Sequence, residues 1–422
     1  MRESNYLAHS LIQRVGDFIQ IRRDIHARPE LAFEEHQTAG LVADKLNGWG
    51  YEVTTGLGGT GVVGTLRRGQ QGKSIGLRAD MDALPILELG SSPWKSQTAG
   101  VMHACGHDGH TAMLLAAAKL IAEDLEFDGA VHLIFQPAEE GAGGALKMME
   151  DGLFDQFPCD AVFAMHNMPG VEAGRFEFRK GSAMASSDNV TITLSGRGGH
   201  GAFPHESADS VVAASSIVMA LQTVVARNVD PLETAVVTVG VIHAGTANNV
   251  IPQTAKLELS IRALDTEVRT LVKERIMKLV KFQAESYGVQ AAIDWREGYA
   301  VLVNTPDETE FATQVATKLF GADRVEPNGP AYTASEDFAF MLQKVPGSYI
   351  FIGNGGPGTR GACHVHNPGY DFNDELIAPG AAFWCADTDH GCLFYMAWSG
   401  QCGGGRANRL CDLGAHRTVA GV

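Results

Sequence analysis

Apolar and polar positions in the first half of the chain follow two alternating patterns. Short apolar runs that end in turn residues predict buried strands at 73–80, 130–136 and 161–166. The segment 111–125 carries apolar residues at helical spacing with one polar face, which predicts a helix between the first two strands. Strand–helix–strand alternation of this kind predicts an α/β fold with a mostly parallel central sheet covered on both faces.

The pattern changes from about Ser187 onward. A strongly alternating segment at 188–196 is followed by a long helical segment at 207–227, two further strand-like segments and another helix. This order predicts a small inserted α+β domain of the ferredoxin-like type with an antiparallel sheet. Near Val301 the α/β pattern resumes, with a helical segment at 308–321 and then a strand.

These changes of pattern divide the chain into four predicted parts. A catalytic domain begins at 1–186, is interrupted by the inserted domain at 187–299, and continues over 300–383. An atypical tail occupies 384–422. In sheets of the predicted kind, ligands bind beyond the carboxyl ends of the strands, so we expect the functional site there.

The charge balance limits the choice of partner. The chain has 33 Lys and Arg against 49 Asp and Glu, a formal net charge of −16. That sign argues against nucleic acid or an anionic membrane surface, because both repel an acidic protein. No apolar run approaches the roughly 20 residues of a membrane helix, and the first 30 residues lack the apolar core of a signal peptide. We therefore predict a cytoplasmic protein.

The segment 103–111, HACGHDGHT, is rich in side chains that bind metals. Cys105 and His107 are two positions apart, so in an extended segment both side chains would point the same way. A converging thiolate and imidazole are suitable ligands for a borderline-soft divalent metal. The alternative is a surface cluster of histidines with a structural cysteine.

Acidic and histidine side chains also follow other predicted strands. Glu139 and Glu140 lie in the loop after the strand at 130–136. Adjacent carboxylates in such a loop point to opposite sides, so one could bind a metal while the other stays free as a base. Further Asp and His side chains come at strand ends or in the segment 363–375: Asp80, Asp82, His166, His364 and His366. Separate segments that supply this many metal-binding side chains favour one shared site.

Taken together, these segments resemble the aminoacylase/carboxypeptidase-type metallopeptidase family, specifically the amidohydrolase branch with hippurate hydrolase and the plant auxin–amino acid hydrolases. The resemblance covers roughly 15–383 and rests on DIHARPELAFEE, RADMDALP, MHACGHDGHT, FQPAEEG, MHNMPG, GRGGHGAFPH, NVIP and HNPGYDFND. It implies an inserted lid and dimerisation domain. It also implies metal-dependent hydrolysis of N-acyl (N-aroyl) amino acids, such as hippurate-type substrates, to a carboxylic acid and a free amino acid.

The same resemblance implies two divalent metal ions per subunit, with Zn or Mn ranked first and Co or Ni also accepted by such ligands. The implied ligands are Cys105, His107, Glu140, His166 and His366. Cys105 would bridge the ions, Glu139 would be the general base, and Asp82 would orient a ligand or tune that base. His366 is favoured over His364 because it directly precedes Asn-Pro in the matching motif.

In the inserted domain the resemblance implies three further residues that act on the substrate. His200 would polarise the substrate carbonyl from across a homodimer, and Asn249 and Arg262 would hold the substrate carboxylate. Arginine is the natural bidentate partner of a carboxylate. An ordinary salt bridge on a strand surface is the alternative for Arg262. The expected partners are therefore a small-molecule N-acyl amino acid and a second copy of the chain.

Other functions are compatible with parts of this pattern. A metallo-dipeptidase or carboxypeptidase of the same fold would use the same ligands, and the identity of the acyl group (benzoyl, acetyl, indoleacetyl or longer) stays open. A thiol-dependent hydrolase would use Cys105 as nucleophile beside His107, but it leaves the distant Glu139–Glu140 segment unexplained. A binding protein that has lost catalysis would have no need of Glu139.

The tail at 384–422 does not match the rest of the resemblance. The family would finish with a short amphipathic helix, whereas this tail is rich in Gly and Cys and lacks helical periodicity. A translated frameshift near residue 384 would give such a composition. Resequencing the gene around that codon tests the hypothesis, and an intact reading frame in an independent isolate would contradict it.

Overall fold

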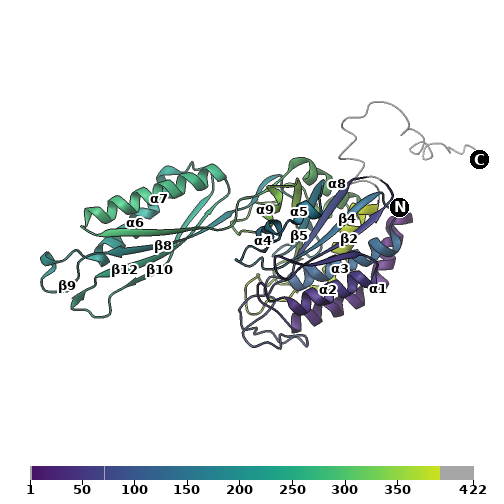
Figure 1. The fold of residues 1–422 in the computed structure, drawn as a ribbon, viewed down its shortest axis with the longest axis horizontal. Helices are drawn as coiled ribbons and strands as arrows, with labels where there is room; N and C mark the ends of the chain where they lie inside the picture. The colour runs from purple at the N-terminus through teal and green to yellow at the C-terminus, as the bar shows by residue number, and fades with distance from the viewer. Residues whose placement is uncertain (1, 71, 390–422) are drawn as a thin grey trace, which may run out of the picture.

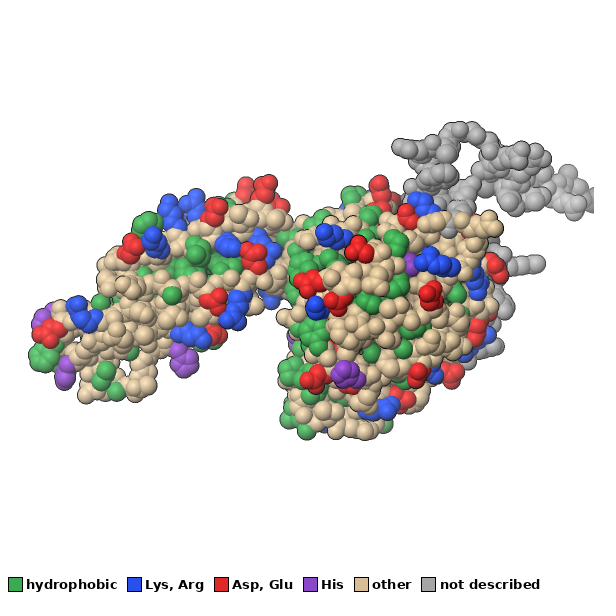
Figure 2. Space-filling view, viewed as in Figure 1, with side chains coloured by type: hydrophobic (Ala, Val, Ile, Leu, Met, Phe, Trp, Pro, Cys, Tyr) green, Lys and Arg blue, Asp and Glu red, His purple; other side chains and the backbone are tan. Residues whose placement is uncertain are grey.

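A computed structural model describes residues 2–70 and 72–389, with side chains described over 14–70 and 72–386. The described chain forms a larger lobe and a smaller, elongated lobe that meet at a narrow waist (Figure 1). The larger lobe contains both termini of the described chain, and the smaller lobe is formed by the middle of the sequence (Figure 1). Acidic and basic side chains are mixed over the visible face of both lobes (Figure 2).

The larger lobe is built around an eight-stranded sheet with the order β1-β2-β4-β3-β5-β16-β6-β15. Its strands are β1 (Glu52–Leu57), β2 (Gly61–Arg68), β3 (Ser74–Asp80), β4 (Gly129–Gln136), β5 (Ala161–Pro169), β6 (Phe176–Glu177), β15 (Val325–Glu326) and β16 (Gly347–Gly355). A separate pair is formed by β7 (Gly181–Met184) and β14 (Leu302–Asn304).

The helices of the larger lobe cover this sheet and fill its connections. They are α1 (Arg2–Ala27), α2 (His36–Gly48), α3 (His107–Asp124), α4 (Gly144–Glu150), α5 (Leu153–Gln156), α8 (Pro306–Phe320), α9 (Phe338–Leu342) and α10 (Ile377–Asp389), with 3₁₀ turns η2 (Ala322–Arg324) and η3 (Asp374–Leu376). Helix α3 packs between the sheet and the helices α1 and α10. The predicted strands at 73–80, 130–136 and 161–166 are confirmed as β3, β4 and β5.

The centre of the large sheet is parallel, and its margins are antiparallel. Strands β4, β3, β5 and β16 run parallel to one another. At one margin, β2 pairs antiparallel with β4, and β1 pairs antiparallel with β2. Every residue of β3 and β4 is buried, as expected for strands whose sheet is covered on both faces. The prediction of a mostly parallel central sheet is therefore confirmed.

The smaller lobe carries a four-stranded antiparallel sheet with the order β10-β12-β8-β13. Its elements are β8 (Ser186–Ser195), β9 (Gly199–His200), η1 (Pro204–Glu206), α6 (Ser210–Asn228), β10 (Ala235–Ala244), β11 (Val250–Ile251), β12 (Thr254–Ala263), α7 (Thr266–Ser286) and β13 (Gln290–Glu297). The order strand–helix–strand–strand–helix–strand is that of ferredoxin-like folds. Helices α6 and α7 pack side by side on one face of this sheet (Figure 1).

Helix α6 is long and apolar enough to cross a membrane, judged by length and composition alone. The sequence analysis predicted no apolar run of this length. In the structure α6 buries Ala213, Ile217 and Leu221 in the core of the smaller lobe. Helices in the core of soluble proteins pass the same test, so α6 is weak evidence for a membrane span.

Helix α10 extends beyond the point where the sequence pattern changes. Trp384 and Cys385 are buried, and α10 packs against α3 and α1. The first residues of the predicted tail therefore belong to the packed core of the larger lobe. The remainder of that tail, from 390 to 422, lies outside the described residues.

Candidate active site

The site is built around the start of helix α3, beyond the carboxyl ends of β3, β4 and β5. Gly106 precedes this helix with a φ of 98°, a left-handed conformation that favours glycine. A Cβ at this position would lie 2.5 Å from the Tyr370 hydroxyl and 2.5 Å from the Asn167 amide nitrogen. Glycine is required here because the backbone both turns sharply and approaches two buried side chains.

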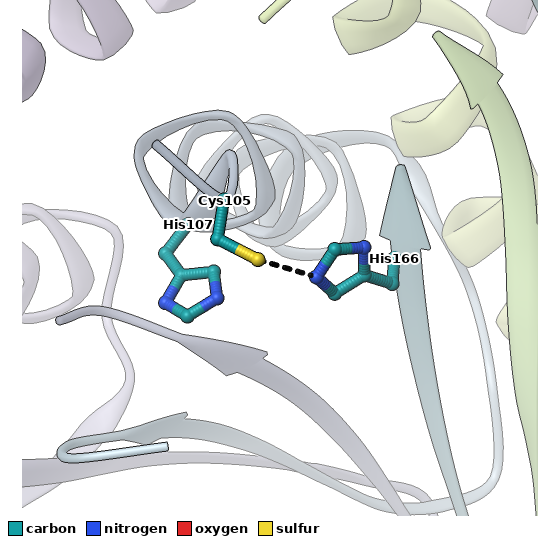
Figure 3. A group of neighbouring side chains, drawn as sticks. All are labelled: Cys105, His107 and His166. Atoms are coloured by element: carbon teal, nitrogen blue, oxygen red, sulfur yellow. Dashed lines mark hydrogen bonds between the residues drawn. The ribbon is translucent and has the colours of Figure 1, made fainter. Parts of the chain in front are cut away.

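This turn changes the relation between Cys105 and His107. The two residues do not lie in one extended segment as predicted, since His107 is the first residue of α3 and the left-handed Gly106 separates it from Cys105. The side chains nevertheless converge. Sγ of Cys105 lies 3.3 Å from Nε2 of His166 on β5, and the His107 ring lies beside the sulfur (Figure 3).

Potential ligand atoms of the predicted metal-binding residues lie close together. Cys105, His107 and His166 form one group in which these atoms are all within 4.8 Å of one another, and Cys105, Glu140 and His366 form another. Nε2 of His366 is 3.2 Å from Oε1 of Glu140. The structure therefore brings together the five residues that the sequence indicated as ligands, and Cys105 belongs to both groups.

Glu139 and Glu140 lie in a turn after β4. The sequence predicted that their carboxylates would point to opposite sides, but one oxygen of each lies within 4.8 Å of the other and of a His107 nitrogen. The prediction that the two carboxylates diverge is wrong because the loop closes a tight turn, in which Gly141 donates its N–H to the Glu139 carbonyl at 2.7 Å.

Asp82 connects the turn to helix α3. Its carboxylate accepts hydrogen bonds from the backbone N–H groups of Glu139 at 3.0 Å and Glu140 at 2.9 Å, and it lies 3.2 Å from Nδ1 of His107. A carboxylate that holds the outer nitrogen of a histidine directs the other nitrogen at the cluster. Asp80 contacts Nδ1 of His110 at 2.6 Å, but Nε2 of His110 accepts the backbone N–H of Asn167 at 3.1 Å.

The cluster concentrates negative charge in a buried space. Burial raises the pKa of the Glu139 carboxyl well above its usual range, and the neighbouring Glu336 and Glu140 raise it further. Burial likewise raises the pKa of the Cys105 thiol well above its usual range. For His107, burial lowers the pKa, but Asp80 and Asp82 outweigh this effect and raise it to about 10. Such a group of acidic side chains favours the presence of cations.

The donor set matches divalent transition metals. Four ligands at about 2.0–2.3 Å from a tetrahedral ion lie roughly 3.3–3.8 Å from one another, which is within the observed spacing. Nε2 of His107 is buried and has no hydrogen-bond partner among the described residues. Burial also lowers the pKa of His166 well below its usual range, which keeps its imidazole neutral and able to bind a metal. Thiolate, imidazole and carboxylate together suit Zn and its neighbours.

A cavity of about 640 Å³ opens over this cluster at the waist between the lobes. Arg262, on β12, lines this cavity, and its Nη1 donates to the Ser335 hydroxyl at 2.8 Å. Among the described residues Arg262 has no carboxylate within salt-bridge distance. Burial lowers its pKa, so this guanidinium is a partly desolvated cation without an anionic partner.

His200 and Asn249 lie elsewhere. His200 is in β9, at the end of the smaller lobe that points away from the larger one, and histidine side chains are visible at that end (Figures 1 and 2). Asn249 lies next to it, since its carbonyl accepts the N–H of Gly201 at 2.8 Å. Within one chain, neither residue lines the cavity that contains the ligand cluster.

Sequence reasoning missed a buried polar group beneath the cluster. Arg78 is buried on β3 and contacts Asp80 at 2.7 Å, Glu336 at 2.9 Å and Asp337 at 3.3 Å. Tyr299, at the return from the smaller lobe, donates its hydroxyl hydrogen to the Glu139 carbonyl. A charged residue inside an otherwise apolar strand could have signalled Arg78, because buried charges require partners.

Comparison with known proteins agrees with this geometry. The model of peptidase family M20/M25/M40 matches residues 76–386. The chain is 46% identical over 378 residues to hippurate hydrolase of Campylobacter jejuni, covering 90% of this chain and 97% of that one. It is 38% identical to N-acetyl-L-cysteine deacetylase of Bacillus subtilis, covering 90% and 89% of the two chains.

A solved structure gives the same result for the fold. A dinuclear metal-binding peptidase of the M20 family from Bacillus subtilis superimposes with a TM-score of 0.77 at 32% identity, covering 88% of this chain and 96% of that one. The family resemblance predicted from the sequence motifs is confirmed, and so is the prediction of a metal-dependent hydrolase of amide bonds. The chain belongs to peptidase family M20/M25/M40.

Proposed function

We propose that this amide hydrolase acts on N-acyl amino acids, preferentially those with an aromatic acyl group, of the hippurate type. One observation carries the proposal: the cavity that contains the Cys, His and Glu cluster also contains Arg262, a cation without a carboxylate partner among the described residues. The relatives named for hippurate and N-acetyl-cysteine support the same substrate class.

Two divalent ions, with Zn or Mn ranked before Co and Ni, would be held by the five clustered residues. One ion would take His107 and His166, and the other would take Glu140 and His366. Cys105 would be shared, since its sulfur belongs to both groups of ligand atoms. The excess of buried carboxylates around the cluster supports a doubly charged occupant at each position.

When bound, the ions would lower the pKa of a bound water and polarise the substrate carbonyl. Glu139 would accept the proton of that water and later give it to the departing amine. Its carboxylate lies within 4.8 Å of Glu140 and of a His107 nitrogen, close enough to reach a water held at the cluster. Asp82, which contacts both the Glu139 backbone N–H and the His107 ring, would hold the base and the metal ligand in fixed relative positions during this transfer.

The two ends of the substrate would meet different walls of the cavity. Arg262 would bind the carboxylate of the amino acid as a charge-assisted hydrogen-bonded pair. The remaining lining includes the apolar side chains Met168, Met184, Tyr349, Phe351 and Val365. An apolar wall of this kind favours an aromatic acyl group over an acetyl group, because more apolar surface leaves water on binding.

Hydrolysis of a substrate panel tests the proposal. Purified protein is incubated with hippurate, N-acetyl-methionine and indoleacetyl-alanine, with EDTA and then with added Zn or Mn. We expect metal-dependent release of free amino acid, fastest with hippurate. Absence of hydrolysis by folded, metal-loaded protein would favour the non-catalytic binding protein. Preferential cleavage of dipeptides would favour the metallo-dipeptidase or carboxypeptidase.

The thiol-dependent alternative has less support. A cysteine nucleophile needs a lowered thiol pKa, whereas burial and the nearby Glu140 and Glu139 raise the pKa of Cys105. That environment favours a thiolate only when a cation binds it. Chelation distinguishes the two mechanisms, since EDTA would reversibly inactivate the metal enzyme and leave a thiol enzyme active.

We further infer that residues 187–299 act as a lid and dimerisation domain, and that His200 and Asn249 serve the site of a second copy. Strand β10 is at the edge of its sheet, and α6 exposes Met219, which is 71% exposed. An open strand edge beside exposed apolar side chains supports pairing with another chain.

Subunit mixing tests this assignment. His200→Ala and Glu139→Gln chains are each expected to be inactive as homodimers. When they are mixed and allowed to exchange subunits, one site of each heterodimer combines an intact Glu139 with an intact partner histidine, so activity should return. A monomer in light scattering, or no recovery on mixing, would contradict the assignment.

A further inference from the structure

Glu35 occupies an unusual position for a carboxylate. It is the residue before helix α2, a position at which a short polar side chain commonly accepts hydrogen bonds from the first turn of the helix. Its side chain makes no such bond. Glu30 does so in its place, accepting from the N–H groups of Gln37 and Thr38 at 2.9 Å each. The Glu35 carboxylate is therefore available for another contact.

That contact is with the loop that contains Glu139 and Glu140. Glu35 is fully buried, and its Oε1 accepts the backbone N–H of Ala138 at 2.9 Å and that of Phe33 at 3.1 Å. Its Oε2 accepts the Thr60 hydroxyl. Burying a carboxylate costs free energy that hydrogen bonds must offset, and all three of these donors come from loops rather than from helix α2.

Ala138 has a backbone conformation that alanine rarely adopts. Its φ is 54°, in the left-handed region, where a Cβ is disfavoured. The next two peptide N–H groups, those of Glu139 and Glu140, then point at the Asp82 carboxylate. The left-handed residue thus sets the direction in which both glutamates leave the strand, and a bond to its N–H helps to hold it there.

We propose that Glu35 is a positioning residue for the active site: by holding Ala138 in its left-handed conformation, it directs Glu139 toward the proton it transfers and Glu140 toward the metal. This inference rests on the proposed roles of those two glutamates. Glu35 lies about a hundred positions before them in the chain and touches neither the substrate cavity lining nor the cluster.

Two substitutions separate positioning from charge. Glu35→Gln keeps an oxygen that can accept from Ala138 and Phe33, and its amide nitrogen can donate to the Thr60 hydroxyl oxygen. Glu35→Ala removes all three contacts. Glu30→Ala is the matched control, because it removes the hydrogen bonds at the start of the same helix but leaves the Ala138 loop untouched.

The experiment measures kcat, KM, the number of bound metal ions after dialysis, and the thermal midpoint. For Glu35→Ala we expect kcat to fall by about 100-fold, as for a displacement of roughly 1 Å. We expect KM to change by less than about threefold and one metal ion to be lost on dialysis. Glu35→Gln should stay within about fivefold of the wild type. Glu30→Ala should lower the thermal midpoint and leave kcat and the metal content unchanged.

A second variant tests the backbone link directly. Glycine adopts left-handed φ values without steric cost, so Ala138→Gly added to Glu35→Ala should recover at least about tenfold in kcat. If Glu35→Ala does not fold, Glu35→Ser replaces it. A serine side chain is also too short to reach Ala138, but its hydroxyl can hydrogen-bond to a water in the space left by the carboxylate. This variant should lose as much activity as Glu35→Ala.

Three outcomes would overturn the proposal: an equal loss in Glu35→Gln and Glu35→Ala, no rescue by Ala138→Gly, or a loss of activity in Glu30→Ala as large as in Glu35→Ala. Failure of the proposed function has a different signature. In that case the wild type itself would show no metal-dependent hydrolysis, whereas an active wild type with an equally active, metal-loaded Glu35→Ala variant would contradict only the role of Glu35.

Discussion

Removal of Arg262 should weaken substrate binding while leaving the chemical step largely intact. The residue lies in the cavity beside the ligand cluster, and its contact with the Ser335 hydroxyl orients the guanidinium. Its pKa is lowered by burial, and no carboxylate of the described residues compensates its charge. A substrate carboxylate would supply the missing partner. Arg262→Ala removes the guanidinium that would pair with this carboxylate and leaves the metal-binding residues unchanged.

The size of the effect follows from the geometry. A hydrogen bond to a charged group contributes about 1.5–3 kcal/mol, and Arg262 is only partly buried, so the value should lie within this range rather than above it. At about 1.4 kcal/mol per factor of ten, KM for hippurate should rise roughly 10- to 150-fold. The value of kcat should change by less than about threefold, since the carboxylate is bound equally in the ground and transition states.

The assay compares hippurate with its amide, which lacks the carboxylate. The wild type should prefer hippurate, and Arg262→Ala should abolish that preference by weakening hippurate alone. Arg296→Ala is the matched control, because Arg296 lies on β13 of the same lobe but is 77% exposed and pairs with Asp294. An unchanged KM for hippurate in Arg262→Ala, or an equal loss with both substrates, would refute the reasoning.

Three further substitutions test the site and its support. Glu139→Gln should lower kcat by about 10²- to 10⁴-fold with full metal content, measured by steady-state kinetics and metal analysis; retention of activity would exclude Glu139 as the base. Arg78→Met should destabilise the fold by about 3–5 kcal/mol in urea unfolding, because it leaves Asp80, Glu336 and Asp337 buried without their cation; an unchanged midpoint would contradict this. Burial lowers the pKa of His132 to about 4, so its protonation favours the unfolded state, and stability should fall by about 3 kcal/mol between pH 6.5 and 4. Chelator-treated His132→Asn should show a shallower fall over that pH range than the treated wild type, and equal slopes would assign the acid sensitivity to other groups.

Local periodicity in the sequence was sufficient to predict the main elements of the fold. The strands β3, β4 and β5 are continuous apolar runs, and burial on both faces of a parallel sheet produces that pattern. The alternating pattern of β8 and the helical spacing of α6 likewise predicted the antiparallel sheet and the helices of the smaller lobe. These patterns depend on which face of an element is buried, and that information is present within each segment.

The sequence also indicated which residues would gather at the site. Cys105, Glu140, His166 and His366 are far apart along the chain, but each lies near the start of a helix, in the last residues of a strand or in a loop. Parallel strands bring their carboxyl ends to one edge of the sheet, so residues at those positions meet without any knowledge of the detailed packing.

The tertiary structure alone decided how these side chains are held. The left-handed Gly106 separates Cys105 from His107, which were predicted to lie in one extended segment. The turn closed by Gly141 brings the carboxylates of Glu139 and Glu140 together, although they were predicted to diverge. The loop that contains Ala138 and Glu139 is held by buried hydrogen bonds to Glu35 and Asp82, which lie on other segments. A hydrogen bond between distant segments leaves no periodic signal in either of them, because its donor and acceptor become neighbours only when the whole lobe packs.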